Sequence, residues 1–190
     1  MTPPKETPTT DFVTIFDETY DQPDCRAYFR MMDALGYRNQ HHAVAAFRAG
    51  LDEVMRLRGI DAPRVFDFAS SYGIVSLLMG HDVTLQEVLR RYRAPQFETA
   101  TPQQVMDWDR NWLAERRRPD GTIRFAGLDV MPNAVAYGAQ VGLFEAAFAE
   151  DLETNDPSDA LALELSQADL IVECGSVAQL MPRALDRMLA

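Results

Sequence analysis

The apolar positions of this chain fall into two patterns, short continuous runs and longer stretches with helical spacing. Apolar runs at 64–73 and 124–134 are typical of buried β-strands that end in a tight turn. Similar short runs lie at 143–148 and 170–174. Helical stretches separate these runs, and this alternation predicts an α/β fold with a doubly wound parallel sheet and helices on both faces.

Helical spacing is clearest before the first strand and between the first two strands. Residues 24–57 carry apolar side chains on one helix face, namely Val44, Phe47, Leu51 and Val54. A polar, largely helical stretch at about 82–121 predicts an insertion, in which Thr101 caps a helix and Pro102 occupies its first turn. Further helices are expected at 132–141, up to Gln167, and from 182 onward.

These patterns predict three parts in the chain. Residues 1–11 contain several Pro and Thr residues and are expected to be a disordered leader. Residues 12–60 form a helical N-terminal segment, and residues 61–190 form the α/β core with its insertion. The chain ends after the fourth predicted strand, whose edge would need a covering segment, a second copy or a partner chain.

Composition narrows the class of partner. The 190 residues include 18 basic and 29 acidic side chains, a formal charge of −11, which disfavours nucleic acids and anionic membrane surfaces. No apolar run approaches the roughly 18 residues that span a bilayer, and no signal peptide is visible. Cys25 and Cys174 lie far apart, and the three histidines form no metal-ligand spacing. A cytoplasmic protein that acts on a small molecule is the expectation.

An acidic residue follows or interrupts each of the first two strands. Asp67 stands within an apolar run, and Asp129 ends the second run. Ligands of parallel sheets bind outside the carboxyl ends of the strands, where an acid can hold ribose hydroxyls, so the pair predicts a nucleotide-type cofactor site. Two plainer interpretations remain open. Asp67 could accept backbone hydrogen bonds from neighbouring turns, and Asp129 could cap the helix that begins near Pro132.

The stretch Asp67-Phe68-Ala69-Ser70-Ser71-Tyr72-Gly73 resembles the first motif, D-x-G-x-G-x-G, of class I S-adenosylmethionine-dependent methyltransferases. The last glycine is kept, whereas Ala69 and Ser71 stand where the first two glycines are expected. The Ser71-Tyr72-Gly73-Ile74 sequence also resembles a bacterial subgroup of methyltransferase-like proteins.

Three further stretches resemble later motifs of that family, in the expected order. Residues 127–134 resemble the second-strand motif, which implies that Asp129 binds the ribose and that Val130 and Met131 flank the adenine. Residues 148–153 resemble the turn after strand three, which implies an adenine contact from Asp151 rather than Glu150. Residues 168–176 resemble the strand-four motif, whose end faces the methionine moiety and the methyl acceptor.

The resemblance therefore implies a Rossmann-like core, S-adenosylmethionine as cofactor, and methyl transfer to a small-molecule O or N acceptor. It implies that residues 12–60 act as a lid, and that three C-terminal strands of the family are missing. It identifies no catalytic residue. The implied cofactor-binding residues are Asp67, Ala69, Ser70, Ser71, Tyr72, Gly73, Asp129, Val130, Met131, Asp151, Leu152, Glu173 and Cys174.

The sequence suggests two further roles for parts of such an enzyme, and it leaves two alternative functions open. The insertion could serve as a second lid, and Arg26 and Arg30 could clamp an anionic acceptor. The main alternative is a non-catalytic or incomplete methyltransferase-like subunit that acts through a protein partner. An NAD-binding protein is the third and least favoured hypothesis, because a pyrophosphate needs a glycine-rich turn and the first turn holds a single glycine.

Overall fold

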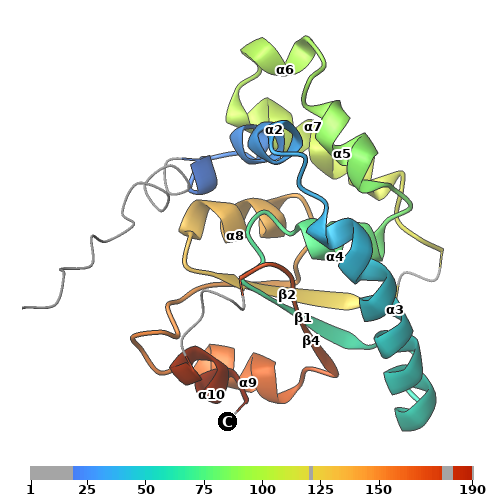
Figure 1. Ribbon diagram of the computed structural model, residues 1–190, viewed down its shortest axis with the longest axis vertical. Coiled ribbons are helices and arrows are strands. Elements are labelled where there is room, and N and C mark those ends of the chain that lie inside the picture. Colours follow the sequence, from blue (N-terminus) through green and yellow to red (C-terminus); the bar gives the residue numbers. More distant parts are fainter. Residues whose placement is uncertain (1–18, 120–121, 177–181, 190) are drawn as a thin grey trace, which may run out of the picture.

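A parallel four-stranded sheet lies at the centre of the computed structural model, which describes residues 19–119, 122–176 and 182–189 (Figure 1). The strands β1 (Arg64–Phe68), β2 (Arg124–Asp129), β3 (Ala146–Ala149) and β4 (Leu170–Glu173) are arranged in the order β3-β2-β1-β4. The predicted mixed α/β class with an all-parallel sheet is confirmed. The order is that of the first four strands in doubly wound nucleotide-binding folds. The predicted leader, residues 1–11, lies outside the described residues.

The third strand begins later than the sequence predicts. Residues 143 and 144, assigned to that strand from their apolar side chains, belong instead to the end of helix α8 (Pro132–Gln140). The backbone N–H groups of Leu143 and Phe144 both donate to the carbonyl of Gly138, after a left-handed turn at Gly142. The first two residues of the apolar run 143–148 thus close the end of helix α8, and the strand begins only at Ala146.

Helices cover both faces of the sheet, and the alternation of side chains in β1 creates a core on each side. Val65 packs into a core with helices α4 (Ile74–Gly80) and α8. Phe66 and Phe68 point to the opposite core, beneath α9 (Asp159–Ser166) and α10 (Pro182–Leu189). Figure 1 shows these helix pairs above and below the strands. Every residue of α4 is buried, which explains why the helix is apolar except for Ser76.

The N-terminal segment is largely helical over 24–57, as the sequence predicts, but it is divided into two helices. Helix α2 (Arg26–Ala34) ends before α3 (Asn39–Arg58), and between them Gly36 adopts a left-handed backbone with φ of 63°. Glycine reaches this conformation without a steric penalty, so the chain changes direction there. The resulting bend lets residues 20–40, called the roof below, pass over the carboxyl ends of the strands, while α3 runs down beside α4 (Figure 1).

The insertion between β1 and β2 contains α5 (Leu85–Arg91), α6 (Gln96–Thr99) and α7 (Pro102–Ala114). Capping boxes begin both longer helices, and the predicted cap at Thr101 with Pro102 in the first turn is confirmed. The two ends of the insertion pair with each other, because Asp82 N–H donates to Arg116 O and Arg118 N–H donates to Gly80 O. This closure allows β1 and β2 to remain neighbours despite the long connection between them.

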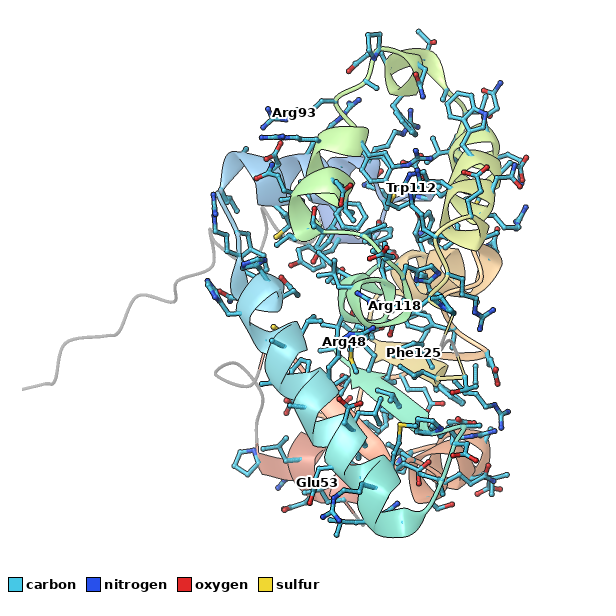
Figure 2. All side chains as sticks on the ribbon, turned by 90° about the vertical axis from the view of Figure 1, so that its right-hand side faces the viewer. Arg48, Glu53, Arg93, Trp112, Arg118 and Phe125 are labelled. Carbon is cyan, nitrogen blue, oxygen red and sulfur yellow. The ribbon has the colours of Figure 1, made fainter. Side chains whose placement is uncertain are left out.

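The insertion supports the roof from outside. Phe29 of α2 stacks on Tyr92 with ring centroids 5.1 Å apart, and Arg93 pairs with Asp33 of α2. Figure 2 shows Arg93 near α2, and Trp112 on the insertion helix α7. Trp112 carries the guanidinium of Arg91 over its ring at 4.7 Å from the centroid, so it serves packing. None of the described helices is long and apolar enough to cross a membrane.

Candidate ligand-binding site

A cavity of about 490 Å³ lies at the carboxyl ends of all four strands. Its floor is made by the turns after the strands, at residues 67–71, 128–131, 150–153 and 174–176. Its cover comes from the roof, through Tyr20, Tyr28, Met32, Leu35, Tyr37, Asn39 and Gln40. The size is that of small-molecule sites in general, and the place is where parallel sheets bind ligands.

The turn after β1 has an unusual backbone. Ala69, Ser71 and Gly73 have φ values of 52°, 49° and 77°, so every second residue of the turn is left-handed. For residues with a Cβ this conformation costs roughly 1–2 kcal/mol each. The turn is held by Ser70 N–H, which donates to Leu128 O at 2.9 Å, and by Gly73 N–H, which donates to Ser70 O at 2.9 Å. The strained turn therefore forms part of the cavity floor and is fixed against β2.

Asp67 is a buried acid with few donors around it. Its Oδ2 accepts hydrogen bonds from the backbone N–H and the hydroxyl of Ser76, at 3.2 and 2.8 Å. Burial raises the pKa of Asp67 to about 7, because these two hydrogen bonds offset only part of the desolvation and Asp129 and Glu173 add repulsion. The structural interpretation of Asp67 is thus partly correct, since it accepts from the first turn of α4. The residue also lines the cavity.

Asp129 connects the first two strand ends. Its Oδ2 accepts from the N–H of Ser71 at 2.8 Å, and its Oδ1 accepts from the N–H of Met131 at 3.1 Å. Burial raises the pKa of Asp129, and the backbone donors oppose that rise. The backbone N–H of Val130 also acts on this carboxylate, and these backbone donors do not use all four of its acceptor positions. Val130 and Met131 also line the cavity beside it.

The turn after β3 brings further acids to the cavity. Asp151 accepts from the N–H of Glu153 at 2.8 Å and from the Thr154 hydroxyl at 2.7 Å, and the Thr154 contact is the main cause that lowers its pKa. Glu150 accepts from the hydroxyl and N–H of Ser158, which caps α9. Both acids and Leu152 line the cavity, and their hydrogen bonds fix the turn in place.

The end of β4 meets the roof directly. Gly175 has a φ of 112°, and a Cβ at this position would collide with the hydroxyl of Tyr37. Tyr37 therefore packs against the bare backbone of the strand end, and it accepts a hydrogen bond from Asn39 at 3.2 Å. Burial raises the pKa of the Cys174 thiol to about 11, so this thiol is protonated at neutral pH and is a poor nucleophile.

Most residues expected at a cofactor site come together here. Those that line the cavity are Asp67, Ala69, Ser70, Ser71, Asp129, Val130, Met131, Asp151, Leu152 and Cys174. Tyr72, Gly73 and Glu173 do not line it. The Tyr72 hydroxyl binds both backbone polar groups of Gln22 and so fastens the roof. Gly73 begins α4, and Glu173 accepts from the Ser176 hydroxyl at 2.6 Å.

Sequence reasoning missed Asn39 and Gln40, which lie far from the motifs and reach the cavity only because the chain bends at Gly36. Gln40 is 3% exposed, and Ser70 is 3% exposed. Within the described part of the chain, Gln40 Oε1 and Ser70 Oγ have no hydrogen-bond partner. Buried acceptors without a donor are uncommon, and here both residues line the same cavity. Only a bend signal at Gly36 could have drawn attention to Gln40.

Two expectations about basic groups and lids are wrong. Arg26 binds Asp24 and the carbonyls of Phe97 and Ala100, at 2.6 and 2.9 Å for the two carbonyls. Arg30 binds Glu98 and the carbonyl of Tyr92. Both guanidinium groups thus anchor α2 to the insertion and cannot clamp an acceptor in the cavity. The insertion itself contributes no described residue to the cavity wall, so it supports the roof and is not a second lid.

All charged side chains that line the cavity, among the described residues, are acidic. Five acidic residues line it, and no Lys, Arg or His does so among the described residues. The described ranges also contain no group of three or more His, Cys, Asp and Glu residues placed to hold a metal ion. Comparisons with protein-family models, with curated proteins and with solved structures find no match to this chain.

Proposed function

We propose that the chain binds S-adenosylmethionine at the carboxyl edge of its sheet and transfers the methyl group to an O or N atom of a small molecule. The observation that carries this proposal is the backbone of the β1 turn. Ala69, Ser71 and Gly73 are left-handed, and these are the three positions at which the methyltransferase motif has glycine. The backbone demand of the motif is thus present even where the glycine is not.

The side chains around the turn support the same ligand. The Asp129 carboxylate has acceptor capacity beyond its backbone hydrogen bonds, which suits the hydroxyl groups of a ribose. Val130 and Met131 offer apolar surface beside it for an adenine ring, and Asp151 lines the cavity at the next strand end. The sulfonium and ammonium charges of the ligand would meet the acidic wall that contains Asp67.

The protein needs to contribute little to the chemical step itself. The sulfonium already activates the methyl group, so the site needs mainly to hold the acceptor atom in line with the methyl carbon and to exclude water. The roof supplies a cover of tyrosine and apolar side chains for this purpose. Burial raises the pKa of Tyr20 to about 12, so its phenol stays neutral in this role.

The proposal is tested by calorimetric titration with S-adenosylmethionine and S-adenosylhomocysteine, with NAD as the unrelated nucleotide. Asp129→Asn keeps the shape of the side chain and removes its charge, and we expect it to weaken binding of both sulfur ligands at least tenfold. Asp52→Asn, at an exposed position on α3, is the matched control and should bind as the native chain does. Binding of NAD alone, or of no nucleotide, would contradict the proposal.

A role through association is the second candidate, and one observation favours it. Among the described residues β4 pairs with β1 alone, so its other edge offers backbone groups to a second chain. A second copy or a partner chain on this edge is compatible with either role. Light scattering combined with the titration separates the two roles, because a non-catalytic subunit predicts a stable oligomer together with no binding of the sulfur ligands.

A further inference from the structure

The cavity wall above the end of β4 offers a second region for a ligand. The cavity extends from the β3 turn to the β4 turn, and the groups that the proposed function uses for the cofactor lie at the ends of β1, β2 and β3. At the β4 end the wall is formed by residues 174–176 of the sheet and by Tyr37, Asn39 and Gln40 of the roof, with Tyr37 packed directly against Gly175. This part of the cavity is called the roof subsite.

The roof subsite offers acceptors. Burial raises the pKa of Tyr37, and a hydrogen bond with the Gln40 side chain is one of the causes that oppose this rise, which places the Gln40 amide beside that hydroxyl. Gln40 Oε1 nevertheless has no hydrogen-bond partner within the described ranges, and its residue is almost fully buried. A buried amide oxygen left without a donor costs about 1–3 kcal/mol, and a ligand N–H group would remove this cost.

The charge of the cavity wall determines which kind of hydrogen-bonding ligand would bind there. The cavity wall carries Asp67, Asp129, Glu150, Asp151 and Glu153 and, within the described chain, no basic side chain. The nearby Arg187 binds Asp156 and the carbonyl of Leu152, at 2.7 and 2.6 Å. A ligand of net negative charge would meet repulsion from this wall with no cation to compensate, whereas a ligand of net positive charge, such as an ammonium, would be attracted.

We propose that the roof subsite binds the methyl acceptor and that this acceptor is an amine carried on an apolar body, recognised through Gln40 Oε1 and the acidic wall. The inference rests on the proposed function for the role of acceptor, but the binding preference can be measured without it. Met32 and Leu35 of the roof supply apolar surface at the same end of the cover. The earlier hypothesis of an anionic acceptor is thereby reversed.

Methyl transfer to the amine begins with the loss of a proton from the ammonium to water. The freed nitrogen lone pair then forms the bond to the methyl carbon. The bond between that carbon and sulfur breaks, and its electron pair stays on sulfur to give the thioether. The methylated nitrogen then releases a second proton to water where it carries one in excess.

The test uses three probes of similar size, 2-phenylethylamine, 2-phenylethanol and 3-phenylpropionate, titrated at pH 7.5 into the full chain with and without saturating S-adenosylhomocysteine. We expect the amine to bind at least tenfold more tightly than the carboxylate, with the alcohol between them. Gln40→Ala should weaken amine binding about tenfold, and Gln40→Glu should preserve it. Gln86→Ala, exposed on α5, is the matched control, and circular dichroism checks that each variant folds.

The proposal is overturned if the carboxylate binds as tightly as the amine, if no probe binds, or if Gln40→Ala changes nothing in a folded protein. The homocysteine ligand separates the two claims. Its binding together with no amine preference leaves the proposed function intact and removes this inference. Amine binding that depends on Gln40, without binding of the sulfur ligand, removes the proposed cofactor and keeps the amine site.

Discussion

Two buried carboxylates, Asp67 and Asp109, occupy very different surroundings in this protein. Asp109 lies between α2, α5, α7 and α8 and is 1% exposed. It accepts from Arg91 Nε at 2.9 Å and from the hydroxyls of Tyr92 and Tyr137 at 3.1 and 2.8 Å. Asp67 is equally buried, but the donors that lower its pKa come from Ser76 alone, and the other charges that act on it are acidic.

The comparison separates a charge that the fold compensates, at Asp109, from one that the fold leaves largely uncompensated, at Asp67. Burial raises the pKa of Asp109, and Arg91 and the tyrosine hydroxyls oppose that rise. The Asp109 cluster joins the insertion to α8 and, through a contact of the Cys25 thiol 3.8 Å away, reaches α2. The Asp109 cluster therefore links the insertion and α8, which pack beneath and beside the roof, to helix α2 of the roof itself. Asp67, with less compensation, lines the cavity, where a cationic ligand would supply what the chain does not.

The largest effect should come from breaking the compensated cluster. Asp109→Ala leaves the Arg91 guanidinium and two tyrosine hydroxyls without their shared acceptor, so we expect the free energy of unfolding to fall by about 3–5 kcal/mol. Urea denaturation measures this change. Asp107→Ala on the same helix removes an exposed pair with Arg110 and should cost under about 0.5 kcal/mol. Equal losses for the two variants would show that the Asp109 cluster is not structural.

Asp67 should behave in the opposite way. Its carboxyl has a pKa of about 7 in the folded chain and 3.8 as the reference value, so the folded state binds the extra proton between these values. The free energy of unfolding of the ligand-free chain should therefore fall as pH rises from about 4 to about 7.

Asp67→Asn removes that pH dependence and should stabilise the ligand-free chain by roughly 1–3 kcal/mol at pH 8. Denaturation curves at pH 5 and pH 8 test this expectation, with Asp52→Asn as the exposed control. A loss of stability at pH 8 in the Asp67 variant would mean that the carboxylate is needed by the fold, as Asp109 is.

The smallest effects concern the strained turn. Ala69→Gly and Ser71→Gly place glycine at left-handed positions, so each should raise the free energy of unfolding by about 1 kcal/mol. Ala45→Gly, at an exposed position inside α3, should lower it by about 0.5–1 kcal/mol. Thermal melts compare the three variants. Destabilisation by both turn glycines would argue that this backbone is not left-handed in solution.

Local patterns were sufficient for the strands and for part of the site. Short apolar runs located the four strands, and the acids at their ends, Asp67 and Asp129, were predicted to meet because carboxyl ends of parallel strands share one edge. Capping chemistry located the start of α7 at Thr101. These features depend on residues close together in the sequence, which is why the sequence reveals them.

Features that depend on distant residues were missed. The Asp109 cluster combines Cys25, Arg91 and Tyr137 with an acid on a helix that the sequence describes only as polar. Tyr72 stands inside a motif, yet it does not line the cavity and its buried hydroxyl binds Gln22 of the roof. Gln40 reaches the cavity because Gly36 bends the chain, and a helical pattern that continues on both sides hides this bend.

The most direct test of the central claim, that a cationic ligand completes the environment of Asp67, is the number of protons released when S-adenosylmethionine binds at pH 6.5. It is measured by calorimetry in two buffers with different ionisation enthalpies. With a pKa of about 7, roughly three-quarters of the Asp67 carboxyls carry a proton at this pH. We predict a release of about half a proton or more by the native chain and almost none by Asp67→Asn. Binding without proton release by the native chain would contradict the account.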